Sequence, residues 1–401
     1  MGATYTWTFE QSFLIFALII FATQALSTFL KSYVPMPLLM GSVFVLCFGM
    51  NWFPSDMILS SNMIAVGTIA FNVLVIHSGT MISTQLLRTQ KKGVAVCILS
   101  TLAMFLVVCF GLRPIIGREL SLLAPGSIVG GGASCAIASR WVTESAPKVA
   151  VFPWMVFMFQ GLFSVPLTCW ALKRESALIL GRLRSGEIKP PAGPPPEEKP
   201  RGVVGRIPGS YKTTAYYLGT IMIVSVLNKL LIGWINGQFG LDLNVNMTAL
   251  IFGFILGQLG LLDKSPLFKS DSYGLLLLGL MGLMANTLAN TIKNGTVFAV
   301  LSLVPSLLLA MAVGTLVLAL GGAFLGKKFG MSPYRGIALC ANCITGFPVG
   351  QVLVERFSKM GENPMEQAVL KSQIGPVLGL GTMLISNGIS IFMVSILVSF
   401  V

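Results

Sequence analysis

Two glycine-rich, polar segments interrupt this apolar chain, Gly126-Ser127-Ile128-Val129-Gly130-Gly131-Gly132-Ala133-Ser134-Cys135-Ala136 and Cys340-Ala341-Asn342-Cys343-Ile344-Thr345-Gly346-Phe347-Pro348-Val349-Gly350-Gln351. Each segment precedes the last apolar span of its half of the chain. Glycine and proline weaken helices, and bare backbone at membrane depth is tolerated only where it is buried in protein or lines a cavity. A pair of such breaks in matching places indicates where a binding site lies.

The composition predicts an integral membrane protein. Of the 401 residues, 54% are hydrophobic and 10% are charged, whereas soluble domains have about 25% charged residues. The first apolar run, 13–29, follows Glu10 and lacks a basic leader region and a cleavage site, so we interpret it as a retained span. The net charge of +13 comes from basic residues between the apolar spans. That placement is typical of loops on the inner side of a membrane, and we expect no nucleic-acid partner.

The seven cysteines do not form a disulfide or zinc framework by their spacing. They are odd in number and lie mostly inside apolar runs, which is typical of buried small residues. Cys340 and Cys343 have Cys-x-x-Cys spacing, but the chain has one histidine and no second such pair. We therefore expect no metal site and no resident cofactor, and redox chemistry at this pair stays an alternative.

The apolar segments repeat in the same order in the two halves. The first half, 1–172, has spans near 11–31, 37–53, 62–84, 94–112 and 149–172, with the glycine-rich segment at about 120–147. The second half, 213–401, has spans near 213–236, 246–262, 272–292, 297–325 and 372–400, with its glycine-rich segment at about 333–361. A hydrophilic, proline-rich linker, 173–212, separates them. The repeated order predicts an internal duplication.

Loop charges predict the orientation. The linker carries nine Lys/Arg against four Asp/Glu, a net charge of +5, and should be cytoplasmic. Loops 54–61 and 237–245 contain no Lys or Arg and should lie outside. These assignments agree only if each glycine-rich segment enters and leaves the membrane on the same side. The predicted fold is therefore an all-α polytopic membrane protein of two inverted repeats. Each repeat has five transmembrane helices and one re-entrant hairpin, giving ten spans and two hairpins with both termini outside.

Broken helices can bind ions at their ends. The N–H groups of the following helix attract a carboxylate, while unwound carbonyls and Ser, Thr or Asn oxygens can hold sodium. The candidate substrate-binding residues are Gly130, Gly131, Gly132, Ala133, Ser134, Arg140, Thr345, Gly346, Phe347 and Pro348. The candidate ion-binding residues are Ser127, Asn286, Asn342, Gly350, Gln351 and Asn387. The alternative is that the glycines only allow close helix packing.

Two further polar groups have open roles. His77 lies inside the third apolar span and is a candidate coupling residue, although a buried histidine is often purely structural. Arg140 follows the first break and could contact an anionic substrate or pair with Glu144 along one helix face.

Several motifs resemble the bacterial sodium:glutamate symporter family. They are Tyr33-Val34-Pro35-Met36-Pro37, the segment Leu122 to Glu144, Cys343-Ile344-Thr345-Gly346-Phe347-Pro348 and Glu355-Arg356-Phe357. The resemblance implies sodium coupling, a homodimer in the bacterial inner (cell) membrane and an elevator-like movement of a transport domain. The family's first hairpin usually reads Gly-Gly-His-Gly-Thr, whereas Gly130-Gly131-Gly132-Ala133-Ser134 lacks the histidine.

Together these patterns predict a secondary active transporter and not an enzyme. The expected partners are a small anionic or zwitterionic substrate, a carboxylate or amino acid of the glutamate type, and the lipid bilayer, with sodium as the coupling ion. A proton-coupled carrier or an exporter of the same fold is the alternative. A channel would need a continuous polar pore, and an enzyme would need a nucleophile–base or metal cluster, neither of which the sequence indicates.

Overall fold

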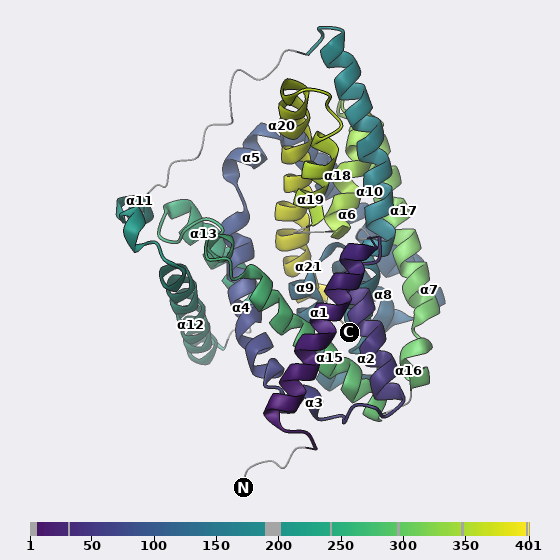
Figure 1. Ribbon diagram of the computed structural model, residues 1–401, viewed down its shortest axis with the longest axis vertical. Helices are drawn as coiled ribbons and strands as arrows, with labels where there is room; N and C mark the ends of the chain where they lie inside the picture. Colours follow the sequence, from purple (N-terminus) through teal and green to yellow (C-terminus); the bar gives the residue numbers. More distant parts are fainter. Residues whose placement is uncertain are drawn as a thin grey trace.

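The computed structural model describes residues 6–30, 33–188, 202–240, 243–294, 297–345, 349–397 and 400. Within these ranges every regular element is a helix (Figure 1). The helices of the first half are α1 (Phe9–Phe29), α2 (Met36–Gly49), α3 (Met57–Ser60), α4 (Met63–Met81), α5 (Thr84–Thr89), α6 (Lys91–Leu106), the π-helix η1 (Val107–Gly111), α7 (Arg113–Ile116), α8 (Arg118–Val129), α9 (Gly132–Ser145), η2 (Pro147–Val149) and α10 (Phe152–Arg184). The remaining helices are α11 (Gly202–Arg206), η3 (Gly209–Tyr211), α12 (Thr214–Phe239), α13 (Val245–Leu259), α14 (Pro266–Lys269), α15 (Tyr273–Asn294), α16 (Val297–Leu301), α17 (Val304–Lys328), α18 (Pro333–Thr345), α19 (Val349–Ser358), α20 (Pro364–Leu380), the π-helix η4 (Gly381–Ile389) and α21 (Ser390–Leu397).

Eight helical segments are long and apolar enough to cross a membrane, which confirms a multi-pass membrane protein. They are 9–29, 63–81, 91–111, 147–184, 214–239, 273–293, 297–328 and 364–397. Two shorter apolar helices, α2 and α13, have 14 and 15 residues. At 1.5 Å per residue they are about 21–23 Å long, shorter than a typical hydrocarbon core of about 30 Å. All ten predicted spans coincide with helices, and the crossings of these two stay a prediction.

Local sequence explains where several helices begin. Thr8 and Gln11 form a reciprocal capping box at the start of α1. Asn363 caps α20 by accepting the Glu366 N–H at 2.8 Å, and Pro364 follows at the first helical position. These devices satisfy backbone donors that would otherwise be unpaired at the helix ends.

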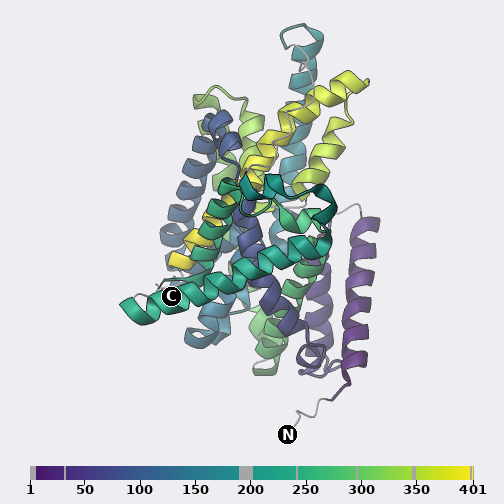
Figure 2. The same cartoon turned by 90° about the vertical axis from the view of Figure 1, so that its left-hand side faces the viewer.

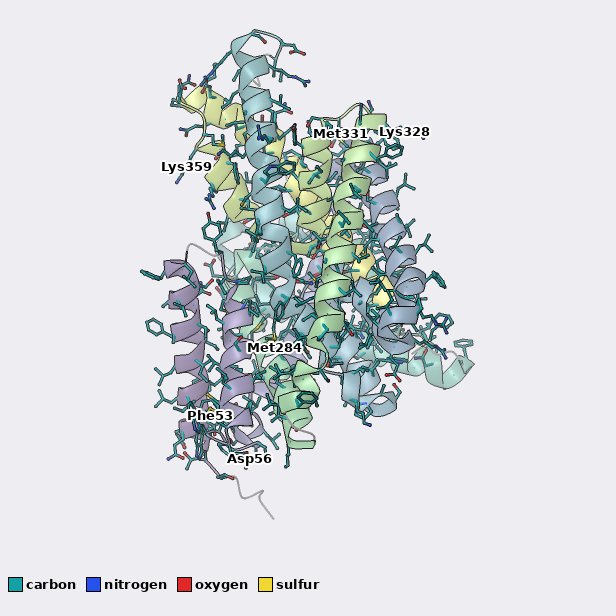
Figure 3. All side chains as sticks on the ribbon, turned by 90° about the vertical axis from the view of Figure 1, so that its right-hand side faces the viewer. Phe53, Asp56, Met284, Lys328, Met331 and Lys359 are labelled. Atoms are coloured by element: carbon teal, nitrogen blue, oxygen red, sulfur yellow. The ribbon has the colours of Figure 1, made fainter. Side chains whose placement is uncertain are left out.

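The bundle has two clearly separate ends. Phe53 and Asp56 lie at one end, Lys328, Met331 and Lys359 lie at the other, and Met284 lies between them (Figure 3). The loop with Asp56 is one that the charge pattern assigns to the outside, and the Lys328 loop is one that it assigns to the cytoplasm. The structure therefore separates these two loops by the length of the bundle.

Helix pairings between the halves follow a reciprocal pattern. The helix of the third span in each half packs against the helix of the second span in the other half: α4 packs on α13, and α15 packs on α2. The last helix of each half packs against the helix before the opposite break, α10 on α18 and α21 on α8. Equivalent helices also meet, α4 with α15 and α6 with α17.

Glycines bring helix backbones into direct contact at two of these seams. A methyl group on Gly253 of α13 would lie 2.1 Å from the Ile76 carbonyl oxygen of α4. A methyl group on Gly336 of α18 would lie 2.0 Å from the Gly322 carbonyl oxygen of α17. Such approaches are typical of tightly packed membrane helices, whose association depends on van der Waals contact.

One helix departs from the arrangement of the others. α12 crosses the long axis of the bundle, whereas α1, the first helix of the other half, runs along it (Figure 2). α12 also packs lightly, with 22% of its most apolar window buried. Its length is sufficient for a span, but its inclination differs from that of its counterpart.

Candidate functional site

The first glycine-rich segment is a sharp break between two short helices. α8 ends at Val129 and α9 begins at Gly132, so only Gly130 and Gly131 are non-helical. The buried Gln160 of α10 spans this break on its carbonyl side. Its side-chain amide nitrogen donates to the carbonyl oxygens of Ser127 at 2.5 Å, Gly130 at 2.5 Å and Ile128 at 3.2 Å. Gln160 therefore satisfies carbonyl groups that the end of α8 leaves without helical partners.

The N-terminus of α9 lies on the other side of the same break. Gly131 is its N-cap and makes no side-chain cap hydrogen bond. The first intrahelical bond runs from the Cys135 N–H to the Gly131 carbonyl oxygen at 3.2 Å. The N–H groups of residues 132–134 therefore have no intrahelical acceptor and carry the positive end of the helix dipole.

The second glycine-rich segment is also flanked by short helices. α18 ends at Thr345 and α19 begins at Val349. The candidate residues Gly346, Phe347 and Pro348 lie outside the described residues. The Thr345 hydroxyl donates back to the Ala341 carbonyl oxygen at 3.4 Å, which leaves its oxygen able to accept.

Residues of both glycine-rich segments line one narrow cavity of about 60 Å³. Gly131 and Gly132 come from the first break, and Thr345 comes from the second. The described residues that line it are Leu74, Ser78, Gly131, Gly132, Ala133, Phe157, Gln160, Tyr273, Leu277, Leu280, Thr345, Ser386 and Ile391. The volume suffices for a few water molecules, so the cavity is nearly closed in this conformation.

Serine hydroxyls from the last helix face the first break. Ser386 belongs to the π-helix η4, an unusual geometry that often occurs at functional sites. Its hydroxyl is buried and has no hydrogen-bond partner in the described part of the chain. A methyl group on Gly131 would lie 3.9 Å from it. The neighbouring Ser390 makes a 2.9 Å hydroxyl–hydroxyl contact with Ser134 and donates to the Ser386 carbonyl oxygen at 2.6 Å.

The described candidate substrate-binding residues divide into two groups. Gly131, Gly132, Ala133 and Thr345 line the cavity, and Gly130 and Ser134 are buried directly behind it. Arg140 is exposed, two turns further along α9, and does not line the cavity.

The candidate ion-binding residues are spread more widely. Ser127 is buried and donates to the Leu123 carbonyl oxygen at 2.8 Å, and the Asn342 amide donates to the Leu378 carbonyl oxygen at 2.7 Å. Asn286 is half-buried on α15, away from the cavity lining. Gly350 and Gln351 line a different cleft. The side chain of Asn387 lies outside what the structure describes.

His77 lies behind the cavity wall. It is fully buried, and its Nδ1 accepts the Leu267 N–H at 3.4 Å. Its ring packs edge-on against Phe268 and is 5.5 Å from that of Tyr273, which lines the cavity. A coupling role for His77 would therefore act through Tyr273.

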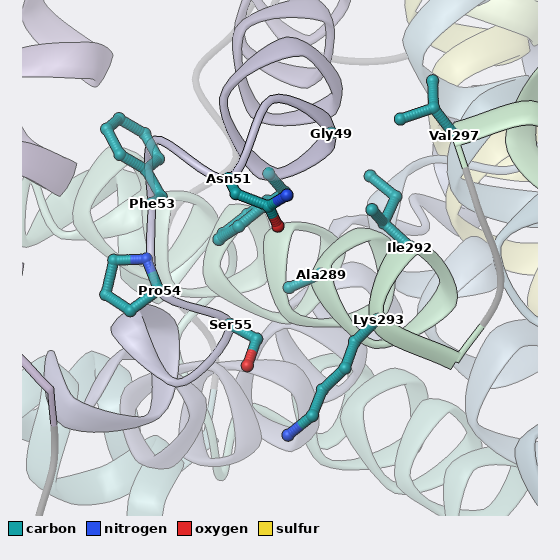
Figure 4. Close-up of a pocket in the computed structure, with 10 residues that line it drawn as sticks. Gly49, Asn51, Phe53, Pro54, Ser55, Ala289, Ile292, Lys293 and Val297 are labelled. Atoms are coloured by element: carbon teal, nitrogen blue, oxygen red, sulfur yellow. The ribbon is translucent and has the colours of Figure 1, made fainter.

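Two open clefts lie toward opposite ends of the bundle. One, of about 710 Å³, is lined by Gly350, Gln351, Glu355 and Lys371, among others. The Lys371 ammonium donates to Glu355 at 2.6 Å and holds the pKa of that carboxyl below its ordinary value. The other, of about 530 Å³, is lined by residues 48–55 and by α15, with Lys293 at its edge (Figure 4).

Sequence reasoning did not select three of the cavity residues that matter most. Gln160, Tyr273 and Ser386 come from three different helices and meet only in the fold. Gln160 and Ser386 are recognisable in the sequence as polar residues inside apolar spans, but nothing in the sequence favours them as site residues. Which of the many such residues reach a break depends on helix rotation, which the sequence does not give.

One pair of cysteines is in contact without forming a disulfide. Cys97 of α6 and Cys343 of α18 are buried with their sulfur atoms 3.8 Å apart, and both are free thiols. No group of three potential metal ligands is found among the described residues.

Over the described residues, the protein is an all-helical, multi-pass membrane protein with a small cavity beside its broken helices. No family model and no curated protein matches the chain. Its function is therefore argued from the site.

Proposed function

We propose that this protein is a secondary active transporter of a small carboxylate or amino acid, coupled to sodium. One observation carries the proposal: residues of the two glycine-rich segments, about 210 residues apart in the chain, line the same cavity. Glycines that served only close helix packing would not be expected to lie around one cavity. Broken helices that meet in the middle of a bundle are typical of transporter binding sites.

The cavity combines two helix ends of opposite polarity. The N-terminus of α9 at Gly131 and Gly132 favours an anionic group. The C-terminus of α18 at Thr345 presents carbonyl oxygens and a hydroxyl, which are ligands that sodium accepts. A carboxylate and a sodium ion can therefore bind near each other without a charged side chain.

The proposed architecture is an inverted duplication. It is supported by the reciprocal pairings, α4 on α13 with α15 on α2, and α10 on α18 with α21 on α8. α8, α9, α18 and α19 have between 10 and 14 residues each, about 15–21 Å, so none spans a bilayer alone. We propose that each pair is a re-entrant hairpin, entering from outside in the first repeat and from the cytoplasm in the second.

Alternating access is supported by the two clefts. The cleft at Lys293 lies at the end that loop charge assigns to the outside, and the cleft at Glu355 lies toward the other end. We propose that α6, α8–α10 and α17–α21 move as a transport unit against α1–α4 and α12–α15. A homodimer in the bacterial inner membrane, with both termini outside and the linker cytoplasmic, completes the proposal by analogy with the symporter family named above.

Purified protein in proteoliposomes tests the function. Uptake of radiolabelled carboxylates and amino acids should require an inward sodium gradient, and preloaded vesicles should show saturable counterflow. Gly131→Leu should abolish both, because the new side chain enters the cavity beside Ser386. Gly219→Leu is the matched control, since a side chain at Gly219 of α12 meets nothing within 4 Å.

Two results would count against the proposal. Uptake that is unchanged without a sodium gradient would remove sodium coupling, and normal transport by Gly131→Leu would remove the assignment of the site. Flux without counterflow or saturation would indicate a channel.

A further inference from the structure

The central cavity combines one anion-binding group with walls that offer no second charged partner. Among the described residues that line it, none is ionisable except Tyr273, and no lysine, arginine, aspartate or glutamate is present. The residues that follow Thr345 in the sequence, Gly346, Phe347 and Pro348, carry no ionisable side chain either. Six lining side chains are large and apolar or aromatic: Leu74, Phe157, Tyr273, Leu277, Leu280 and Ile391.

The polar groups of the cavity are unequally available. Gln160 directs its amide nitrogen to the carbonyl groups of α8, so it covers the negative side of the first break. The Ser78 hydroxyl donates to the Leu74 carbonyl oxygen at 2.8 Å within its own helix. Ser386 is different, because its buried hydroxyl has no hydrogen-bond partner among the described residues and faces Gly131.

The first break therefore presents an excess of donors to the cavity. The carbonyl end of α8 is neutralised by Gln160, whereas the N–H end of α9 has no side-chain cap. A buried hydroxyl without a partner costs free energy unless a ligand completes its hydrogen bond. One carboxylate at the start of α9 would accept from the N–H groups of residues 132–134 and from Ser386.

From this arrangement we infer that the substrate is a monocarboxylate with a short apolar body, held by the α9 N-terminus and the Ser386 hydroxyl. The inference rests on the proposed transport function and narrows it. A second carboxylate would be buried against leucine, isoleucine and phenylalanine without an opposite charge, and burying an unpaired charge is strongly unfavourable. An ammonium group would have to displace sodium from the α18 C-terminus, where the proposed transport function places the coupling ion. Glutamate and other dicarboxylates are therefore excluded from this cavity.

Four compounds with carbon chains of equal length separate the possibilities. Pentanoate has one carboxylate, glutarate adds a second, norvaline adds an ammonium group, and glutamate adds both. With sodium present, pentanoate should raise the thermal midpoint of the detergent-purified protein, enter proteoliposomes and compete with its own labelled form. The other three should do none of these at equal concentration.

Two serine variants test the contact itself. Ser386→Ala should weaken pentanoate binding by about 10–100-fold, the usual range for losing a hydrogen bond to a charged group. Ser395→Ala is the matched control, because the buried Ser395 hydroxyl of α21 also has no hydrogen-bond partner among the described residues but does not line the cavity. Its affinity for pentanoate should equal that of the parent protein.

The outcomes distinguish this inference from the function on which it rests. Uptake of glutamate, glutarate or norvaline without pentanoate uptake would overturn the monocarboxylate assignment and leave the transporter proposal in place. Unchanged pentanoate affinity in Ser386→Ala would overturn the binding mode. Absence of uptake and counterflow for all four compounds would overturn the inference together with carboxylate transport.

Discussion

Replacing Gln160 should destabilise the first break and stop transport together. Gln160→Met keeps the size of the side chain but removes the donor that reaches the carbonyl oxygens of Ser127 and Gly130, each at 2.5 Å. Both oxygens belong to buried residues, so losing the donor leaves them without this hydrogen-bond partner.

The size of the effect follows from these two short contacts. Leaving one buried acceptor unsatisfied costs about 1–3 kcal/mol in soluble proteins, whereas single polar contacts in membrane bundles contribute about 0.6–1.7 kcal/mol. Two contacts at the membrane values give about 1–3 kcal/mol for Gln160→Met. At about 2 °C per kcal/mol for a large chain, the thermal midpoint should fall by about 2–6 °C.

The assay is thermal unfolding in detergent together with uptake into proteoliposomes. Gln24→Met is the control, because Gln24 of α1 is exposed and its amide reaches only Thr28 at 3.4 Å. Gln160→Glu should be worse than Gln160→Met, since a carboxylate would face carbonyl oxygens. A Gln160→Met protein with the parent midpoint and parent uptake would refute the role that we assign to this amide.

Two further changes have defined outcomes. Gly322→Ala should lower the free energy of unfolding by about 1–3 kcal/mol and with it the thermal midpoint, because the added methyl group would lie 2.4 Å from the Gly336 carbonyl oxygen. Gly233→Ala is the control, because the added methyl group meets nothing within 4 Å, and its midpoint should be unchanged. Equal midpoints for the two variants would contradict the close α17–α18 contact. Because Lys371 lowers the pKa of the Glu355 carboxyl, the stability that this exposed pair contributes is present above the ordinary glutamate pKa and is lost as the pH falls through the lowered one. This loss of stability should be small and should shrink further as salt is added. A Lys371→Met protein should not show it. Identical stability-versus-pH curves for the parent and the variant would contradict the pairing.

Much of the fold is predictable from local patterns. Every apolar segment of suitable length became a helix, and the first glycine break fell within two residues, Gly130 and Gly131. Helix breaking is a local property of glycine and its neighbours, so the sequence specifies it directly. Thr345 of the second glycine-rich segment lines the same cavity as Gly131, and the function of that cavity stays a prediction.

Other features depend on tertiary contacts that local patterns do not encode. Ser386 and Gln160 are single polar residues in apolar helices, and only helix rotation determines that both reach Gly131 while Asn286 does not. The inclination of α12 likewise depends on packing, because its sequence is as apolar as that of α1. The exposure of Arg140 is not predictable from the sequence for the same reason. This residue lies two turns along α9 from the break, at an exposed position.

The π-helix η4 makes the length of the last helix as important as its composition. Residues 381–389 form hydrogen bonds with one residue more per ring than an α-helix has. Because a wider turn advances by a smaller angle per residue, this segment holds about one residue more than α-helical spacing would need between α20 and α21. Deleting one residue there would let the segment return to α-helical spacing while α21 largely keeps its orientation relative to α20, so the contact between Ser390 and Ser134 would be retained. The direction of the side chains inside the wide turn, Ser386 among them, would change instead, so the extra residue determines which side chain reaches the first break.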